Sequence, residues 1–393
     1  MVFLYTTILL CILIFTLSIV LIKLLNLSRN QITSILITGF IILFLCNLNT
    51  SIQASLTGLN LVIKSLFPTI FPFSVICNLL ICYDGISLYS KLLGPLICKP
   101  LNLNKSSSFP ITASVLSGYP LGCKYSCDLY AQGYINRSEF ERLLNIATNA
   151  SPIFLIGSVG VAMLGNIKYG IILLIGNYLS PLIIGILTKN KKNVCENLDY
   201  IPEEKDMNFG SAIKFSIENG INTTLQVGAF VIIFSIIIGI IKNSSLIEAI
   251  FTNIEKLINL PPSTLYGLFL GSIEFTNGCK LISLSNLSIV LKLSIISFIC
   301  SFSGLSIIGQ ISSFIGDYNI SLIKYSLIKF CQGLISFIVT FFASIIILRE
   351  EPASTIILSS GKIYIVLQVV IYSLLIASLV IAIILKRKKL HIP

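Results

Sequence analysis

The segment Ser117-Gly118-Tyr119-Pro120-Leu121-Gly122-Cys123-Lys124 interrupts an apolar helical pattern with glycine, proline and a lysine. The apolar run before it, Phe109–Leu116, is too short to cross a bilayer, which takes about 20 residues. A second segment, Glu274-Phe275-Thr276-Asn277-Gly278-Cys279-Lys280, follows the apolar run Leu265–Ile273 in the other half of the chain. Both segments end in Gly-Cys-Lys. Interrupted apolar segments in corresponding places of two halves are typical of a transporter built from repeats.

The composition places the chain in a membrane. Of its 393 residues, 55% are hydrophobic and 11% are charged, and the mean hydropathy is +0.95. A soluble protein carries about 25% charged residues. The net charge of +11 comes from lysines and arginines that flank apolar runs, so it indicates membrane topology and no nucleic-acid partner. We therefore expect an all-α polytopic membrane protein that lies in a lipid bilayer.

The residue types needed for catalysis or metal binding are scarce in the apolar segments. The single histidine is His391, which leaves no histidine for a Ser-His or HExxH site among the apolar spans. The 11 cysteines form no CxxC pair, and most lie in apolar runs, where cysteine acts as a small packing residue. We expect no enzyme, no catalytic residues, no metal site and no cofactor.

The apolar runs predict about nine spanning helices, with the two interrupted segments as re-entrant hairpins that return to the side they entered. Phe3–Leu25 is long enough to span, and its flanks predict an anchor that is retained. The predicted domains are two N-terminal transmembrane helices (1–50), a first repeat (51–188), a cytoplasmic linker (189–210), a second repeat (211–348), and a C-terminal transmembrane helix with a basic tail (349–393).

Each repeat is expected to begin with an amphipathic piece and a separate span. These are Ser51–Lys64 then Leu66–Cys82 in the first repeat, and Ser211–Thr224 then Leu225–Ile241 in the second. A polar link is expected over Tyr125–Arg142, after the first hairpin.

The two halves match at three places in the same order. Phe73-Ser74 matches Phe234-Ser235, Gly122-Cys123-Lys124 matches Gly278-Cys279-Lys280, and Asn149-Ala150-Ser151-Pro152 matches Ser301-Phe302-Ser303-Gly304. If the N-terminus lies outside, re-entrant hairpins place most lysine- and arginine-rich links, and the C-terminus, in the cytoplasm. The first repeat then starts outside and the second inside, so the repeats are predicted to be inverted.

The interruptions form the predicted binding site. A helix that stops within hydrocarbon leaves backbone groups without partners, which is tolerated only inside protein or beside water. The N–H groups at the start of a half-helix carry partial positive charge and suit an anion. The predicted substrate-binding residues are Gly118, Tyr119, Pro120, Gly122, Lys124, Asn149, Ser151, Thr276, Asn277, Gly278, Lys280, Ser301 and Ser303.

For several of these residues a purely structural role explains the sequence as well as substrate binding does. Lys124 and Lys280 are long enough to extend their charges to the membrane surface. Ser151 and Ser303 can donate to the preceding helical turn instead of binding a solute. Both alternatives stay open at the level of the sequence.

Glu274 is the most informative single residue, because a carboxylate between Ile273 and Phe275 is expensive in a membrane. It could pair with Lys280 or Lys292 as part of the structure, or it could carry the ion that is coupled to transport. We expect the ion-coupling role, with the structural pairing as the alternative.

A family resemblance is carried by Phe67-Pro68-Thr69-Ile70-Phe71-Pro72-Phe73, by Ser117–Lys124, and by Glu139-Phe140-Glu141-Arg142 through Asn149-Ala150-Ser151-Pro152 to Gly157. With these residues the chain resembles the YlbJ (SpoVV) family of sporulation integral membrane proteins over Ser51–Leu348. The resemblance implies a nucleoside-recognition Gate domain, related to parts of concentrative nucleoside transporters. Cys123 and Cys279 depart from the family, which often has alanine there.

The resemblance also implies a function: movement of dipicolinate out of the mother cell through the outer forespore membrane of a spore-forming bacterium, by alternating access. Dipicolinate is a flat dianion, and two opposed half-helix starts with Lys124 and Lys280 would suit its two carboxylates. A transporter of nucleosides or other small organic solutes, and a membrane scaffold for spore assembly that transports nothing, are the alternatives. The sequence leaves an oligomer open.

Overall fold

The computed structural model describes residues 28–189 and 208–348, and in these ranges the chain forms helices and no strand. Five of the described helical runs are long and apolar enough to cross a membrane. The prediction of an all-α polytopic membrane protein is thereby confirmed. Phe3–Leu25, most of the linker 189–210, and the C-terminal helix with its basic tail lie outside the described residues.

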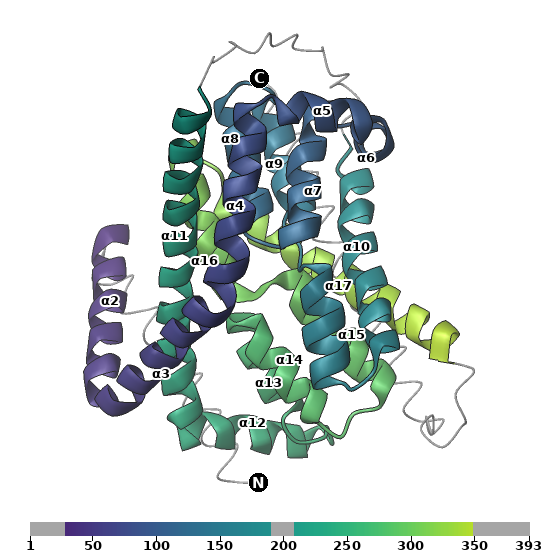
Figure 1. Cartoon of the computed structure of the whole chain (residues 1–393). Helices are drawn as coiled ribbons and strands as arrows, with labels where there is room; N and C mark the ends of the chain where they lie inside the picture. The colour runs from purple at the N-terminus through teal and green to yellow at the C-terminus, as the bar shows by residue number, and fades with distance from the viewer. Residues whose placement is uncertain (1–27, 190–207, 349–393) are drawn as a thin grey trace.

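Two long helical runs pack against each other along one side of the molecule (Figure 1). One consists of α3 (Leu48–Leu61), η1 (Val62–Leu66) and α4 (Phe67–Cys82), and the other is α11 (Phe209–Asn243). Each run has 35 residues. At 1.5 Å per residue each is about 50 Å long, well over the ~30 Å of a hydrocarbon core.

The predicted boundaries inside these two runs are wrong, because the structure joins Ser51–Lys64 to Leu66–Cys82 and Ser211–Thr224 to Leu225–Ile241. Glycines let the runs approach closely along their length. A Cβ added at Gly58 would lie 2.8 Å from Ser235 Oγ, and a Cβ added at Gly228 would lie 3.0 Å from Val62 Cγ1. This continuous packing stabilises the helices through the polar residues at which the sequence predicted a break.

The first run bends at η1, as Figure 1 shows between α3 and α4. This π-helical turn lies directly ahead of Pro68, which cannot donate a backbone hydrogen bond to the preceding turn. The bend therefore falls on the N-terminal side of the proline, as expected for a proline kink.

Both interrupted segments are hairpins of two short helices that pack on each other. The first consists of α7 (Ser108–Ser117) and α8 (Leu121–Ala131), and the second of α13 (Thr264–Ile273) and α14 (Phe275–Leu284). A helix of ten residues is about 15 Å long, half of a hydrocarbon core. The predicted interruptions are present in both halves, and their re-entrant course through a bilayer stays a prediction.

Each hairpin is followed by a second interrupted pair. In the first half these are α9 (Arg137–Ile146) and η3 (Ile153–Met163), and in the second half α15 (Ile289–Phe302) and α16 (Gly304–Ile315). Two long helices complete the bundle, with α10 and α15 packed on α17. Their bounds are Ile167–Leu187 for α10 and Leu322–Ile347 for α17.

The predicted polar link over Tyr125–Arg142 is wrong in its first part. Helix α8 continues to Ala131, and the chain is helical again from Arg137. The reason is that Lys124 and Asp128 form an ion pair one helical turn apart, which stabilises the helix through these polar residues.

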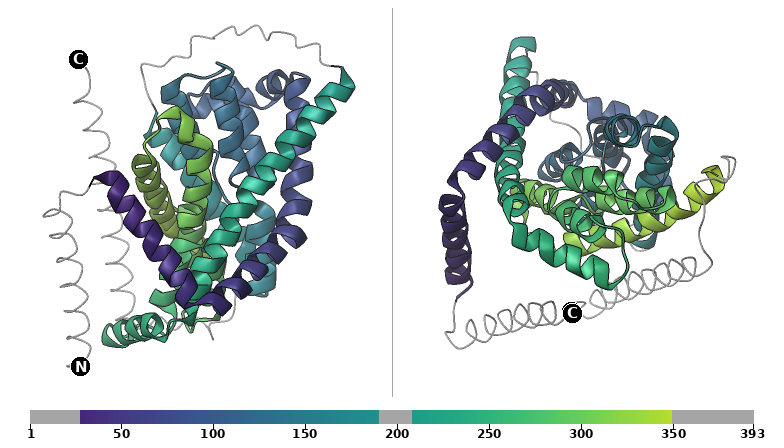
Figure 2. Two further views of the ribbon diagram at one scale, coloured as in Figure 1. Left: turned by 90° about the vertical axis from the view of Figure 1, so that its left-hand side faces the viewer. Right: turned by 90° about the horizontal axis from the view of Figure 1, so that it is seen from below.

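The short amphipathic helices lie at opposite ends of the molecule (Figure 1). Helices α5 (Gly85–Leu92) and α6 (Gly94–Leu101) precede the first hairpin through η2 (Lys105–Ser107), and α12 (Ser245–Leu257) precedes the second. The predicted inverted repeat would produce this arrangement, and it remains a prediction. Helix α2 (Arg29–Cys46) stands apart from the bundle (Figure 2), and η4 (Gly316–Tyr318) leads into α17.

Candidate functional site

The turns of the two hairpins meet through an aromatic pair. When Gly122-Cys123-Lys124 is matched to Gly278-Cys279-Lys280, Tyr119 corresponds to Phe275. Their ring centroids are 5.3 Å apart with the planes at 89°, an edge-to-face contact. Phe154, just after the second interruption of the first half, makes another edge contact with Phe275 at 5.0 Å. The structure thus brings the predicted interruptions of both halves together.

The first hairpin turn is held by its own half of the chain. Gly118 has a φ of 81°, a left-handed conformation that glycine adopts without steric cost. The next residue, Tyr119, donates its backbone N–H to the Asn149 carbonyl at 2.9 Å. A Cβ at Gly118 would lie 3.0 Å from the Ser151 backbone nitrogen. The predicted site residues Gly118, Tyr119, Asn149 and Ser151 therefore form one contact region.

The second hairpin turn repeats this relation. Ser303 and Gly304 both have a φ of 75°, and they interrupt the helix between α15 and α16. A Cβ at Gly304 would lie 3.1 Å from the Ile273 carbonyl oxygen, at the end of α13. In each half, the turn of the hairpin thus lies on the turn that interrupts the following helix.

The two hairpins differ at the start of their second helix. The carboxylate of Glu274 accepts the backbone N–H groups of Thr276 at 3.0 Å and Asn277 at 2.9 Å, and also the Asn277 side-chain amide at 2.7 Å. It therefore caps α14 and takes the donors that an anion would need there. At the start of α8 no described side chain forms such a cap. Of the two predicted half-helix starts, that of α8 is the one without a side-chain cap on its N–H groups.

The structural alternative for Glu274 was an ion pair with Lys280 or Lys292, and the described residues form neither. None of the described ion pairs joins it to Lys280 or Lys292, and Lys292 donates instead to the Ser283 carbonyl at 3.0 Å. Lys242, near the end of α11, donates to the Asn277 side-chain oxygen. The Asn277 side chain therefore lies between the Lys242 ammonium group and the Glu274 carboxylate.

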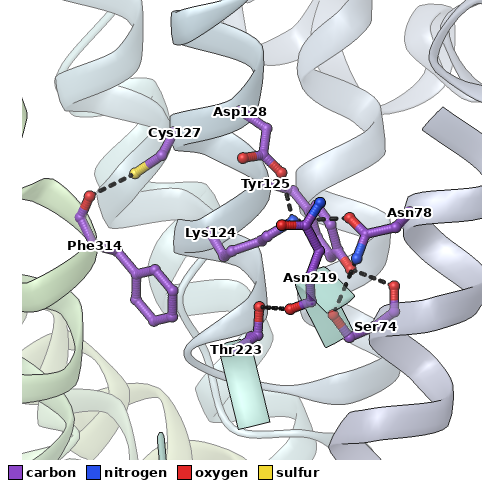
Figure 3. Close-up of polar contacts among 9 residues, drawn as sticks. All are labelled: Ser74, Asn78, Lys124, Tyr125, Cys127, Asp128, Asn219, Thr223 and Phe314. Carbon is purple, nitrogen blue, oxygen red and sulfur yellow. Dashed lines mark hydrogen bonds and ion pairs between the residues drawn. The ribbon is translucent and has the colours of Figure 1, made fainter. Parts of the chain in front are cut away.

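Lys124 is buried and already neutralised (Figure 3). Its Nζ lies 2.7 Å from Asp128 Oδ2 and 2.8 Å from Asn78 Oδ1, and 4.5 Å from the centroid of the Tyr125 ring. Figure 3 shows the Asn219 side chain of α11 pointing into the same region. Lys124 therefore bonds within the protein, where Asp128 balances its charge.

Lys280 has a different environment from its counterpart in the first half. Its side chain is exposed on α14, whereas Gly278 and Cys279 beside it are buried. Gly278 fixes the packing of the second hairpin, because a Cβ there would lie 2.2 Å from the Gly271 Cα. Gly122 lets the first hairpin pack on the end of α9, because a Cβ there would lie 1.7 Å from the Ala147 carbonyl oxygen.

Ser301 belongs to a buried polar network among α10, α15 and α17. Its hydroxyl donates to Asn177 Oδ1 at 2.9 Å, and the Asn177 amide donates to Ser297 Oγ at 3.1 Å. Ser297 in turn contacts the Ser336 hydroxyl at 2.6 Å and accepts from Thr340 Oγ1 at 2.6 Å. This network links three helices, so Ser301 helps to hold the bundle together just before the Ser303-Gly304 interruption.

Lys329 and Gln332 were not among the predicted site residues, and they lie on α17 against the interruption at Thr148 and Asn149. Lys329 Nζ donates to the Thr148 carbonyl at 2.5 Å and to Gln332 Oε1 at 2.9 Å. The Gln332 amide donates to Asn149 Oδ1 at 2.9 Å. An ionisable residue inside an apolar helix is the signal that could have identified this pair. In the described ranges, no three His, Cys, Asp or Glu side chains are grouped as metal ligands.

Comparison with solved structures finds limited likeness. A CNTnw variant in an outward-facing state has a TM-score of 0.46 and 19% identity, covering 71% of this chain and 75% of that one. A CNTnw variant in the intermediate 2 state has a TM-score of 0.44 and 17% identity, covering 78% and 87%. With TM-scores below 0.5, neither likeness establishes a shared fold.

Comparison with curated proteins gives a clearer result. No family model matches the chain. The sporulation integral membrane protein YlbJ of Bacillus subtilis (strain 168) is 25% identical over 334 residues, which cover 78% of this chain and 81% of that protein. The similarity spans most of both chains, and it confirms the predicted resemblance of this integral membrane protein to the YlbJ family.

Proposed function

We propose that this protein carries a small organic anion across a membrane by alternating access. The proposed substrate is dipicolinate, moved from the mother cell across the outer forespore membrane during sporulation. The name of the B. subtilis relative supports the link to sporulation, and the family resemblance supports the substrate. In this proposal the hairpins are re-entrant, the repeats are inverted and the C-terminus is cytoplasmic.

The observation that carries the proposal is how the two hairpin turns meet. Within each half, backbone groups hold the turn to its own interrupted helix, as the Tyr119 N–H bond to the Asn149 carbonyl shows. Between the halves, the turns touch by ring edges, Tyr119 on Phe275, a kind of contact worth about 1 kcal/mol. Two turns that are each held in their own half and touch each other by ring edges can move against each other, and relative movement of the repeats is how repeat-built carriers open alternately to each side.

The proposed substrate site comprises the turns and the lysines that follow them. The uncapped start of α8 supplies backbone donors for a carboxylate. Glu274 is the proposed ion-coupling residue, because a cation bound to its carboxylate would compete with the N–H groups of Thr276 and Asn277 that this carboxylate accepts. Ion binding would then loosen the second turn.

Uptake of radiolabelled dipicolinate into proteoliposomes tests the proposal directly. The wild-type protein is expected to concentrate dipicolinate, and Lys124→Ala and Lys280→Ala are expected to lose uptake. If both variants transport as the wild type does, the two lysines do not hold the substrate. If the wild-type protein takes up no dipicolinate, the substrate assignment is wrong.

A nucleoside or another neutral solute is the second candidate, and one observation favours it. Asp128 balances the charge of Lys124, and the polar groups nearest the two turns include the neutral amides of Asn149 and Asn277. For a neutral solute, Lys280→Ala should transport normally, whereas Asn149→Ala and Asn277→Ala should not. Uptake of uridine beside dipicolinate in the same proteoliposomes distinguishes the two candidates.

A further inference from the structure

Lys329 is one of the largest fully buried side chains of the described protein, with 0% of its surface exposed. It lies in the apolar helix α17, where it contacts the residue just before the Asn149–Pro152 turn. Its Nζ donates to two neutral oxygens, the Thr148 carbonyl and Gln332 Oε1.

No carboxylate balances this lysine in the described ranges. The acidic residue that bonds to α17 is Glu141, and it pairs with Lys324, at the start of the helix. Tyr325, one helical turn before Lys329, contacts Thr148 Oγ1 through its hydroxyl at 3.0 Å. Taking an ammonium group out of water without a counter-ion costs several kcal/mol, so an anion that binds here removes a large penalty.

The two lysines that the sequence put forward are weaker candidates for this role. Lys124 is already paired with Asp128, and Lys280 is exposed, where its charge is screened by solvent. Lys329 combines full burial, the absence of a described acidic partner and direct contact with one of the turns.

We propose that Lys329 is the positive charge that selects an anionic substrate, and that a substrate carboxylate binds its Nζ in place of Gln332 Oε1. This inference rests on the proposed carrier function and names the residue that sets its substrate class.

Binding at this position also has a mechanical consequence. Gln332 links Lys329 to the side chain of Asn149, and the Asn149 carbonyl holds the first hairpin turn at Tyr119. A carboxylate that displaces Gln332 frees this amide, so that the link between α17 and the first turn is weakened. Anion binding is thereby coupled to movement of the turn.

The test is binding of dipicolinate, with uridine as a neutral probe, to the full chain in lipid nanodiscs by isothermal titration calorimetry. Lys329→Met is expected to weaken dipicolinate binding by about 100-fold, because truncating one partner of a buried charge pair costs 2–5 kcal/mol. Lys329→Arg keeps the charge and should bind within about tenfold of the wild type. Lys256→Met removes an exposed lysine of α12 and is the matched control, with binding unchanged.

A second variant keeps the test decisive if Lys329→Met does not fold. Gln332→Glu has nearly the same shape and places a carboxylate on Lys329, which should raise the melting temperature and weaken dipicolinate binding by at least about 30-fold. A purely structural role of Lys329 would raise the melting temperature without this loss.

The remaining outcomes distinguish failure of the Lys329 proposal from failure of the proposed carrier function. If the wild type, Lys329→Met and Gln332→Glu all bind dipicolinate equally, the inference is overturned and the carrier proposal stands. If the wild type binds uridine and no dipicolinate, the anionic substrate class is overturned for both. If it binds neither probe and transports neither, the proposed function fails together with the inference.

Discussion

The first hairpin turns through Gly118-Tyr119-Pro120, whereas the second turns through Glu274 at the position that matches Gly118. The backbone plan is shared, since each turn lies on the turn that interrupts the next helix. The charges are placed differently. In the first hairpin the charged pair, Lys124 with Asp128, lies one turn further along α8, and in the second the carboxylate lies in the turn itself.

A further feature is common to both halves. A buried carboxylate holds the beginning of each hairpin: Glu139 accepts the Asn104 N–H and, at 2.9 Å, the Ser107 hydroxyl, and Glu255 accepts the Ser263 N–H at 2.9 Å. Negative charge at a helix start stabilises it. The two hairpins therefore share a frame, while the residues in and just after their turns differ in chemistry.

The largest effect is expected from breaking the shared frame. Gly122→Ala and Gly278→Ala should each cost about 3 kcal/mol or more, because the new Cβ would lie 1.7 Å and 2.2 Å from backbone atoms. Thermal unfolding of the purified protein measures this. Gly157→Ala, where no atom lies within 4 Å of the added Cβ, is the control. Wild-type melting of either hairpin variant would contradict the packing described above.

The next effect concerns the tip of the second hairpin. Glu274→Gln keeps an acceptor for the α14 cap but removes the charge, so we expect about 100-fold slower or uncoupled transport with a stability loss of about 1 kcal/mol. Proteoliposome uptake and the melting temperature report the two quantities separately. Normal, coupled transport by this variant would remove the ion-coupling role of Glu274.

A smaller effect should distinguish the two matched lysines. Asp128→Asn leaves the buried Lys124 without its counter-ion and should cost about 2 kcal/mol, below the full cost of a buried pair because Asp128 is partly exposed. Lys280→Met, on the exposed counterpart, should change stability by less than about 0.5 kcal/mol. Equal losses in the two variants would show that the lysines share one environment. A double-mutant cycle of Lys124→Met with Asp128→Asn gives the coupling energy.

The smallest effect is expected at the aromatic residue that both hairpin turns have at matching positions. Tyr119→Phe makes the two contacting rings identical and removes one long hydrogen bond, from the hydroxyl to the Cys300 carbonyl at 3.4 Å. The expected cost is below about 1 kcal/mol, with transport close to wild type. Loss of transport in this variant would mean that the hydroxyl acts on the substrate.

Helix ends were predictable where local chemistry controls the backbone. The interruptions at Gly118-Tyr119-Pro120, Glu274 and Ser303-Gly304 were predictable because glycine, proline and a capping carboxylate act within one turn. The continuity of α11 and of the run from α3 to α4 was not predictable, because close packing between distant glycines maintains these helices.

Composition and periodicity were enough to predict a helical membrane protein with two matched interruptions, because they report directly on burial in lipid and on helix ends. Which charges are balanced became clear from the packing of the helices. Asp128 pairs with Lys124 on the same helix, but Lys329 meets the Asn149 turn from a helix more than 170 residues further along the chain. Pairing across such a separation depends on how the helices pack, and no local pattern encodes it.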